Sequence, residues 1–339
     1  MMKTYTVAVA GAMGAVGTEM LKNLESRNFP VGEIRPLDVG DNVGREILFK
    51  GQPVKVQQSC EEAFAGVDIA LFAVGANVSK FLAPAAVEKG AVVIDNSSQW
   101  RMTEGVPLVV PEVNPQDLKL HKGIIANPNC STIIAMVPIK PLHDAAVVKR
   151  VIATTFQAVS GAGLPGLGEL REQAGQILRG EPISPKVFPH QIAFNVIPHI
   201  DVLEDNGYTY EEMKMFNEGR KILGCPDLRV NCTCVRVPVF RSHSESITIE
   251  TEKPITPDQA RSILSGAPGV KVVDDPAKLE YPMPADTSNQ DLVYVGRIRR
   301  DISTDANALT FWCCGDQVRK GAAVNAIQIA EKMIEMQLI

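Results

Sequence analysis

Short apolar runs alternate with amphipathic runs through the first third of the chain. Apolar runs occupy residues 5–10, 34–37, 67–74 and 91–95, and helical patterns occupy residues 19–24 and 78–88. Strands that are apolar on both faces and alternate with helices are typical of a parallel sheet covered by helices on both sides. We therefore predict an α/β fold that begins with a doubly wound, Rossmann-type domain.

The pattern changes at about residue 150, where longer β-branched segments begin. Residues 151–163 read as a long strand that ends in a glycine-rich turn, and residues 235–250 as two strands joined by a short bend. Further strands are predicted at residues 270–273, 293–298 and 308–312, and helices at Tyr208 onwards and over residues 318–336. These segments predict a second domain with its own sheet.

Composition and charge narrow the class of protein. The chain has 339 residues, of which 45% are hydrophobic and 22% are charged, as expected of a soluble globular protein with two cores. No apolar run reaches the roughly 18 residues of a membrane span, and the start leads directly into a strand, so we expect a cytoplasmic protein without a membrane partner. A net charge of −5 without a basic cluster argues against nucleic acid, so the expected partner is a small molecule.

The seven cysteines are scattered and odd in number, which favours reduced thiols over a disulfide framework. Cys232 and Cys234 alternate on one face of a predicted strand, and Cys313 and Cys314 lie in another. Neither pair has the spacing of zinc ligands together with a second pair of ligands elsewhere in the chain, so we expect no metal site.

A glycine turn follows the first strand and precedes the first helix. Residues 11–17 read Gly-Ala-Met-Gly-Ala-Val-Gly, a GxxGxxG spacing in the position of a pyrophosphate site, although a purely structural turn would look the same. After the second strand, Asp38 and Asp41 suit the free ribose hydroxyls of NAD better than the 2′-phosphate of NADP. Only Arg45 could assist a phosphate there, and a solvated acidic turn is the alternative.

Cys130 lies in the turn Asn127-Pro128-Asn129-Cys130-Ser131-Thr132, directly before an apolar run. Pro128 disfavours helix at Asn127, and the small polar residues are good helix caps, so Cys130 is predicted at a helix N-terminus. Backbone N–H groups and the helix dipole stabilise a thiolate there and could bind an oxyanion. A small buried cysteine is the alternative.

Five further residues are candidates for binding or proton transfer. Arg101 follows a strand in a polar loop and could bind an anion; Gln157, near a strand end, could hydrogen-bond a ligand. Glu211 and Lys214 share a helix face, and His243 lies beside a bend where it could move a proton. A surface arginine, an outward-facing glutamine, a surface ion pair and a structural histidine are the respective alternatives.

A cysteine nucleophile, a nicotinamide site, anion-binding arginines and a histidine together suit the reduction of an activated acyl group through a thioester. At this point the chain resembles aspartate-semialdehyde dehydrogenase. The resemblance is carried, in collinear order along nearly the whole chain, by residues 11–17, 129–132, 157–163, 211–214, 236–243 and 320–323.

The resemblance implies NADP-dependent reductive dephosphorylation of L-aspartyl 4-phosphate to L-aspartate 4-semialdehyde, on the route to lysine, threonine and methionine. Cys130 would form the thioester, His243 would handle the proton and Gln157 would orient the intermediate. Arg236 and Glu211 would hold the α-carboxylate and α-amino groups, and Arg101, Asn129 and Lys214 would receive the phosphate. The cofactor would be lined by Gly11, Met13, Gly14, Ala15, Val16, Asp41, Asn42, Ser160, Gly161 and Gln317.

We accordingly expect a homodimer with two domains in each chain. Residues 1–128 would bind the dinucleotide, with the helix of residues 317–339 packing back on them, and residues 129–316 would form an α+β catalytic and dimerisation domain with a mixed sheet. Val39 and Asp41 replace the serine and arginine usual in the family, and Met13 replaces a common threonine. We therefore expect NADP with measurable use of NAD.

Two other functions fit the same features. N-acetyl-γ-glutamyl-phosphate reductase shares the architecture and the chemistry on a longer substrate, but the arrangement of Glu211, Lys214, Arg236 and His243 favours aspartate. A non-catalytic family member acting as a binding protein is disfavoured because the cysteine, the histidine and both arginines are retained.

Overall fold

The computed structural model describes residues 3–339 and divides the chain into two compact units. The first unit contains the chain up to Asn129 together with Ala322–Ile339, and the second contains Cys130–Gly321. The chain therefore crosses between the units after Asn129 and again after Gly321, where the sequence had placed the crossings after residues 128 and 316.

The first unit is built on a parallel six-stranded sheet with the strand order β5-β2-β1-β6-β7-β8. Its strands are β1 (Tyr5–Ala10), β2 (Val31–Asp38), β5 (Gln57–Gln58), β6 (Ile69–Phe72), β7 (Val92–Asp95) and β8 (Ile124–Ala126). A separate hairpin joins β3 (Glu46–Phe49) to β4 (Gln52–Lys55). The parallel sheet predicted from the apolar runs is confirmed.

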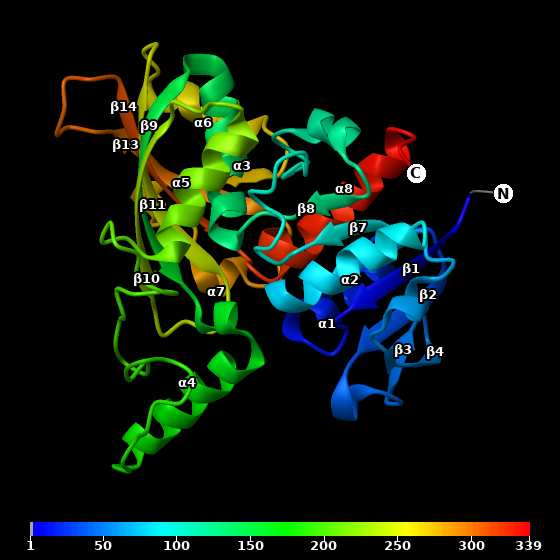
Figure 1. Cartoon of the computed structure of the whole chain (residues 1–339). Helices are drawn as coiled ribbons and strands as arrows, with labels where there is room; N and C mark the ends of the chain where they lie inside the picture. The colour runs from blue at the N-terminus through cyan, green and yellow to red at the C-terminus, as the bar shows by residue number, and fades with distance from the viewer. Residues whose placement is uncertain (1–2) are drawn as a thin grey trace. The chain divides into compact units, whose positions relative to one another are not determined.

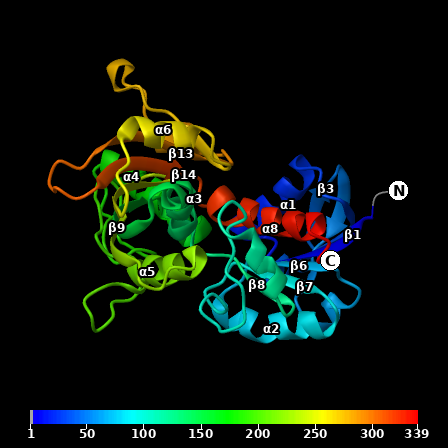
Figure 2. The ribbon, with the colours of Figure 1, turned by 90° about the horizontal axis from the view of Figure 1, so that it is seen from above.

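Helices cover both faces of this sheet. Val7 and Val9 of β1 belong to a core that includes α1 (Ala15–Ser26) and α8 (Val324–Glu335), whereas Ala8 and Ala10 face a second core with α2 (Ala76–Glu88). Figure 2 shows α1 and α8 on one side of the strands and α2 on the other. Because side chains alternate along a strand, one apolar run supplies both cores, which is the reason that β1 is apolar throughout.

The second unit contains a mixed sheet with the order β10-β9-β11-β14-β13-β12. Its strands are β9 (Val148–Gln157), β10 (Arg229–Arg236), β11 (His243–Thr251), β12 (Val270–Val272), β13 (Val293–Arg300) and β14 (Ala308–Gly315). The β9/β10 and β12/β13 pairs are parallel and the other pairs antiparallel, so the predicted mixed sheet is confirmed.

Three helices, α3 (Cys130–Ala146), α5 (Tyr210–Leu223) and α6 (Pro257–Ser265), pack against this sheet, and Figure 1 shows them on one side of the strands. Arg236 at the end of β10 pairs with Gln157 at the end of β9, and β11 begins beside them with His243. All three residues are buried. The ends of β9 and β10 and the start of β11 therefore bring polar groups together at one end of the sheet.

Two predicted elements need correction. The strand predicted over residues 151–163 ends at Gln157; a 3₁₀ turn (Val159–Ala162) follows, and α4 (Gly163–Leu178) begins at Gly163. The helix predicted from residue 318 opens with a π-helical turn (Arg319–Ala323) before α8.

In the described range 3–339, no helix has the length and hydrophobicity needed to cross a bilayer.

Candidate active site

Cys130 is the first residue of α3, directly after the turn that contains Pro128. The helix continues into residues 133–137, which are buried, and α3 contacts β9, β11, β13 and β14 of the sheet. Cys130 itself is only partly buried, and no acidic residue lies in the first turn. The predicted position at a helix N-terminus is confirmed, and the dipole there favours a thiolate.

Gly321 lies with its backbone against Cys130. A Cβ atom added at Gly321 would lie 2.9 Å from the Cβ of Cys130 and 3.3 Å from its Cα. Gly321 sits within the π-helical turn Arg319–Ala323, so this turn runs past the cysteine at backbone distance. Position 321 therefore accepts no side chain unless Cys130 moves.

His243 faces the sulfur atom of Cys130. Its Nε2 lies 3.5 Å from Cys130 Sγ, and the residue is completely buried at the start of β11. The other ring nitrogen, Nδ1, accepts a hydrogen bond of 3.0 Å from the backbone N–H of Ala158. A nitrogen that accepts a hydrogen bond carries no proton, so the neutral ring has its proton on Nε2 and directs it towards the sulfur.

The surroundings keep this imidazole neutral. Burial, and then the nearby cation of Arg236, lower the pKa of His243 to about 3, and Glu211 opposes this only in part. At neutral pH the ring therefore offers one N–H donor to the sulfur or to an oxyanion beside it. The alternative of a structural histidine away from the thiol is excluded by the 3.5 Å contact.

Gln157 belongs to a chain of hydrogen bonds. Its Oε1 accepts from Thr155 Oγ1 at 3.0 Å, and its Nε2 donates to Glu211 Oε1 at 3.0 Å. Glu211 Oε2 accepts from Lys214 Nζ at 2.9 Å, which also bonds Asp201 at 2.8 Å. Because both ends of the Gln157 amide are engaged, its orientation is fixed.

The Glu211–Lys214 pair is buried, unlike an ordinary surface ion pair. Only 8% of the Glu211 side chain and 13% of the Lys214 side chain are exposed. Burial opposes the charge on Lys214, but Glu211 and Asp201 outweigh it, so the pKa of Lys214 lies above its usual value. The site therefore holds a permanent cation and a carboxylate next to Gln157.

Arg236 and Gly161 complete the group around His243. Arg236 Nη1 donates to the carbonyl oxygen of Ala158 at 2.8 Å, and burial lowers the pKa of Arg236, while Glu211 and Cys130 act against that change. A Cβ atom at Gly161 would lie 2.7 Å from Arg236 Nη1 and 3.4 Å from the His243 ring. The turn after β9 thus contacts both residues through backbone.

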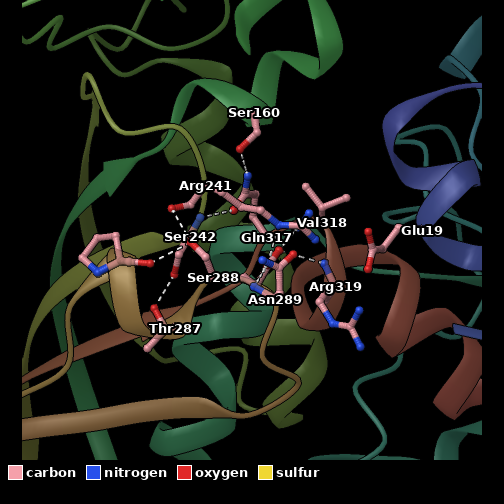
Figure 3. A network of polar contacts seen from close by, with 12 residues as sticks. Glu19, Ser160, Arg241, Ser242, Thr287, Ser288, Asn289, Gln317, Val318 and Arg319 are labelled. Carbon is pink, nitrogen blue, oxygen red and sulfur yellow. Dashed lines mark hydrogen bonds and ion pairs between the residues drawn. The ribbon is translucent and has the colours of Figure 1, made fainter. Parts of the chain in front are cut away.

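Gln317 and Ser160 are also linked in the second unit. The side-chain amide of Gln317 donates to the hydroxyl of Ser160 and accepts the backbone N–H of Ser242 at 2.9 Å, as Figure 3 shows. Nine predicted residues therefore lie in this unit: Cys130, Gln157, Ser160, Gly161, Glu211, Lys214, Arg236, His243 and Gln317. The contacts described above join seven of these residues: Cys130, Gln157, Gly161, Glu211, Lys214, Arg236 and His243.

Arg101 and Asn129 lie in the first unit, and both are buried. Arg101 Nε donates to the carbonyl oxygen of Asn127 at 3.0 Å, and its Nη2 donates to that of Asn96 at 2.8 Å. Both carbonyls follow the carboxyl ends of strands in the parallel sheet. Arg101 is therefore a fixed cation and not a mobile surface arginine.

Two glycines of the glycine turn, Gly11 and Gly14, differ in whether the packing of the chain leaves room for a side chain. Gly11 has φ +78°, and a Cβ there would lie 2.4 Å from the carbonyl oxygen of Ala73. Gly14, the N-cap of α1, differs because a Cβ would approach only the carbonyl oxygen of Gly11, at an ordinary 3.4 Å. The first turn of α1, which includes Ala15 and Val16, carries no acidic residue.

Asp38 ends β2 and ties the following loop to the glycine turn. Its Oδ2 accepts the backbone N–H of Met13 at 2.9 Å, and its Oδ1 accepts from Val39 N–H at 2.8 Å and from the Asn42 side chain at 3.2 Å. Asp41 is exposed in the 3₁₀ turn Gly40–Asn42. The two acids therefore differ: Asp38 shapes the loop and Asp41 faces solvent.

Sequence reasoning missed two groups of this site. Thr155 lies two residues before Gln157 on the same strand face, a spacing that could have identified it. The backbone N–H of Ala158 has no signal in the sequence, because any residue except proline supplies it. Across residues 3–339, no group of three or more His, Cys, Asp and Glu side chains is arranged to hold a metal ion.

Comparisons with known proteins agree with this arrangement. Residues 6–121 match the model of the semialdehyde dehydrogenase NAD-binding domain, and residues 139–320 match that of the semialdehyde dehydrogenase dimerisation domain. Aspartate-semialdehyde dehydrogenase of Aquifex aeolicus is 51% identical over 340 residues, covering 99% of this chain and 99% of the relative.

Solved structures give the same family. Aspartate semialdehyde dehydrogenase II of Vibrio cholerae, complexed with ASA, is 44% identical with a TM-score of 0.96 and covers 98% of this chain and 99% of that one. The Candida albicans enzyme, solved with NADP, is 25% identical with a TM-score of 0.77 and covers 99% and 100%. None of these relatives is named a reductase of N-acetyl-γ-glutamyl phosphate. With both domain models matched in order and a relative of this identity along its whole length, the chain belongs to the aspartate-semialdehyde dehydrogenase family.

Proposed function

We propose that the chain catalyses the NADP-dependent reductive dephosphorylation of L-aspartyl 4-phosphate to L-aspartate 4-semialdehyde. The observation that carries the proposal is the 3.5 Å contact between Cys130 Sγ and His243 Nε2 at the first turn of α3. A thiol at a helix N-terminus with an N–H donor beside it is suited to attack an activated acyl group. Family membership supports aspartyl phosphate as the acyl donor.

In the proposed first step, the Cys130 thiolate attacks the acyl carbon, the bond from that carbon to the phosphate oxygen breaks, and phosphate leaves, taking one proton from solvent to become hydrogen phosphate. The tetrahedral oxyanion on the way is stabilised by the Nε2–H of His243 and by N–H groups of the α3 N-terminus. When bound, the nicotinamide supplies the hydride that reduces the acyl carbon. The second tetrahedral oxyanion then collapses and expels the Cys130 thiolate, which needs no net proton.

We assign the substrate contacts by charge. The guanidinium of Arg236 would bind the α-carboxylate, because its planar fork matches a carboxylate, and Glu211 would accept from the α-amino group. Arg101, Asn129 and Lys214 would receive the phosphate, and Gln157 would orient the thioester. The buried position of these charges supports the assignment, since paired buried charges keep a fixed geometry.

The glycine turn fits a dinucleotide. Gly14 is not required by the packing of the chain itself, so its missing side chain leaves the N-cap of α1 open to a pyrophosphate. We therefore assign the pyrophosphate to residues 11–16, with Ser160, Gly161 and Gln317 as further cofactor contacts and Asp41 and Asn42 beside the ribose.

We propose NADP as the main cofactor, with measurable use of NAD. The NADP-bound relative supports the first part. The exposed carboxylate of Asp41 and the apolar Val39, where the family usually has arginine and serine, support the second, because they offer no cation or hydroxyl to a 2′-phosphate.

We further propose a homodimer that acts in the cytoplasm on the route to lysine, threonine and methionine. The match of residues 139–320 to a dimerisation domain supports the assembly. The biosynthetic role of the family supports the compartment and the route.

The reverse reaction tests the function. Oxidation of aspartate semialdehyde by NADP or NAD is followed at 340 nm with and without inorganic phosphate, for the wild type, Cys130→Ala and Cys225→Ala. We expect activity that requires phosphate, a loss on the order of a thousandfold in Cys130→Ala, and none in Cys225→Ala, whose partly buried thiol lies after α5. Phosphate-independent activity, or an active Cys130→Ala enzyme, would refute the thioester route.

A further inference from the structure

The residue before His243 has an unusual backbone conformation. Ser242 is completely buried and has a φ of +74°, in the left-handed region that residues other than glycine seldom adopt. Such a conformation persists only where the surroundings hold it, and it is often found beside functional groups. The contacts of Ser242 therefore bear on the position of His243.

Gln317 holds the backbone of Ser242. Its Oε1 accepts the Ser242 N–H at 2.9 Å, and its Nε2 donates to the hydroxyl of Ser160. The opposite orientation of the amide would direct two donors at each other, so the network itself fixes which end is oxygen. Figure 3 shows Gln317 between Ser160 and Ser242.

Thr287 holds the side chain of Ser242. Thr287 is fully buried at the end of α7 (Pro284–Thr287), and its hydroxyl donates to the carbonyl oxygen of Met283 at 3.0 Å. A hydroxyl has one proton, so in the 2.6 Å contact between Ser242 Oγ and Thr287 Oγ1 the serine donates and the threonine accepts. Ser242 is thus bound on its N–H and on its side chain.

The anchor of this group is Asp316, which is fully buried. Its carboxylate accepts from Arg241 Nε at 2.5 Å and from the backbone N–H groups of Asn289 and Val318 at 2.6 and 2.9 Å. Since His243 pairs with Gly315 across β11 and β14, the residues just beyond each strand meet here. Asp316 therefore ties the segment before His243 to the segments that carry Thr287 and Gln317.

We propose that Thr287 and Gln317 are positioning residues for His243: by holding Ser242 in its left-handed conformation, they set the imidazole with Nε2 towards Cys130 Sγ. The inference rests on the proposed role of His243. Both residues hydrogen-bond Ser242, the neighbour of His243, so each acts through Ser242. The sharper test is on Thr287, because Gln317 is also assigned to the cofactor.

The test compares Thr287→Val, which keeps the shape and removes the acceptor, with Thr287→Ser, which keeps the hydroxyl. The readouts are kcat/KM for aspartate semialdehyde and the pH dependence of Cys130 alkylation by iodoacetamide, followed on the Cys130 peptide by mass spectrometry without cofactor. We expect Thr287→Val to lose on the order of tenfold in kcat/KM and to need a higher pH for alkylation, and Thr287→Ser to restore both.

Two further variants make the result decisive. Ser242→Ala removes the same hydrogen bond from the other side, so it should match Thr287→Val, and the double variant should be no worse than either. If Thr287→Val does not fold, Ser242→Ala alone provides the test. Thr310→Val is the matched control, because Thr310 shares a 2.8 Å hydroxyl contact with Thr248 in the same pair of strands, and it should leave kcat/KM unchanged.

Unchanged kcat/KM and an unchanged alkylation profile in Thr287→Val and Ser242→Ala would overturn the inference, even if both variants melt at a lower temperature. That result would leave the proposed function intact, provided that Cys130→Ala is inactive. Conversely, an active Cys130→Ala enzyme would refute the function whatever Thr287 does.

Discussion

The Nδ1 atom of His243 accepts the backbone N–H of Ala158 at 3.0 Å, and this single contact decides what the imidazole can do. A proton on Nδ1 would point at another proton, so the ring can neither take the opposite tautomer nor become a cation without breaking the contact. In the proposed reaction, His243 would therefore act as an Nε2–H donor to the sulfur and to oxyanions. The general base of a serine or cysteine protease triad has the opposite arrangement, with its Nδ1 as a donor.

The neutral state of His243 predicts a pH dependence of stability. Its pKa falls from the ordinary 6.5 to about 3 on folding, so below pH 6.5 the unfolded chain takes up a proton that the folded chain refuses. The contribution to stability is present above pH 6.5 and is lost as the pH falls towards 3. Between pH 6.5 and 5, urea unfolding should show the wild type losing up to about 1.4 kcal/mol per pH unit more than His243→Gln. Parallel curves would contradict this prediction.

The buried carboxyl group of Glu245 predicts that stability changes with pH in the opposite direction. It is fully buried in β11, and burial, followed by Cys234 and Glu211, raises its pKa well above the ordinary 4.5. The folded chain therefore keeps a proton that the unfolded chain releases, and stability falls as the pH rises above 4.5. Glu245→Gln should be more stable than the wild type at pH 8, and the difference should shrink towards pH 4.5. Denaturant unfolding at both pH values measures it, and a less stable variant at pH 8 would contradict it.

Gly321→Ala should displace Cys130. The new methyl group would lie 2.9 Å from the Cβ of Cys130, so we expect a loss of stability of about 1–3 kcal/mol and a lower kcat. Gly168→Ala is the matched control, because Gly168 lies within α4 with no atom within 4 Å of an added Cβ. It should be neutral or stabilising by up to about 1 kcal/mol. Equal effects of the two changes would show that the contact with Cys130 does not matter.

The loop after β2 predicts how cofactor choice can be altered. Replacing Val39 by serine and Asp41 by arginine should raise the ratio of kcat/KM for NADP over NAD by on the order of tenfold or more, because arginine would bind a 2′-phosphate that Asp41 would repel. Asp41→Asn, which removes only the charge, should give a smaller rise. A wild type that already prefers NADP strongly would refute the electrostatic argument.

Local signals account for the parts of the fold that the sequence predicted. The apolar strands of the first unit bury both faces, so their composition alone identifies them, and the turn at Pro128 places Cys130 at a helix start. Helix α4 was missed because Gly163, Pro165 and Gly166 at its start read as a turn. Packing of Leu170 against Phe188 and Ile192 favours helix there, and no local pattern reports that packing.

The residues of the site likewise divide into those that the sequence identifies and those that only the fold reveals. Residue types with strong chemistry, such as Cys130 and His243, could be selected from the sequence. Their orienting partners could not, since the hydrogen bond from Ser242 to Thr287 joins positions 45 apart, and that from Gln157 to Glu211 joins positions 54 apart. A threonine has no distinguishing pattern until the fold shows what its hydroxyl meets.

The first unit is made of two separate stretches of chain, and this decides which unit can fold first during synthesis. Tyr5, Val7 and Val9 share their core with Ile327, Ala330 and Met333, which follow the whole of the second unit in the chain. The second unit, by contrast, is one continuous stretch and can fold as it emerges. In a nascent chain the part that bears Cys130 is therefore complete before the nucleotide-binding part can close, and removing α8 would open the core that contains β1.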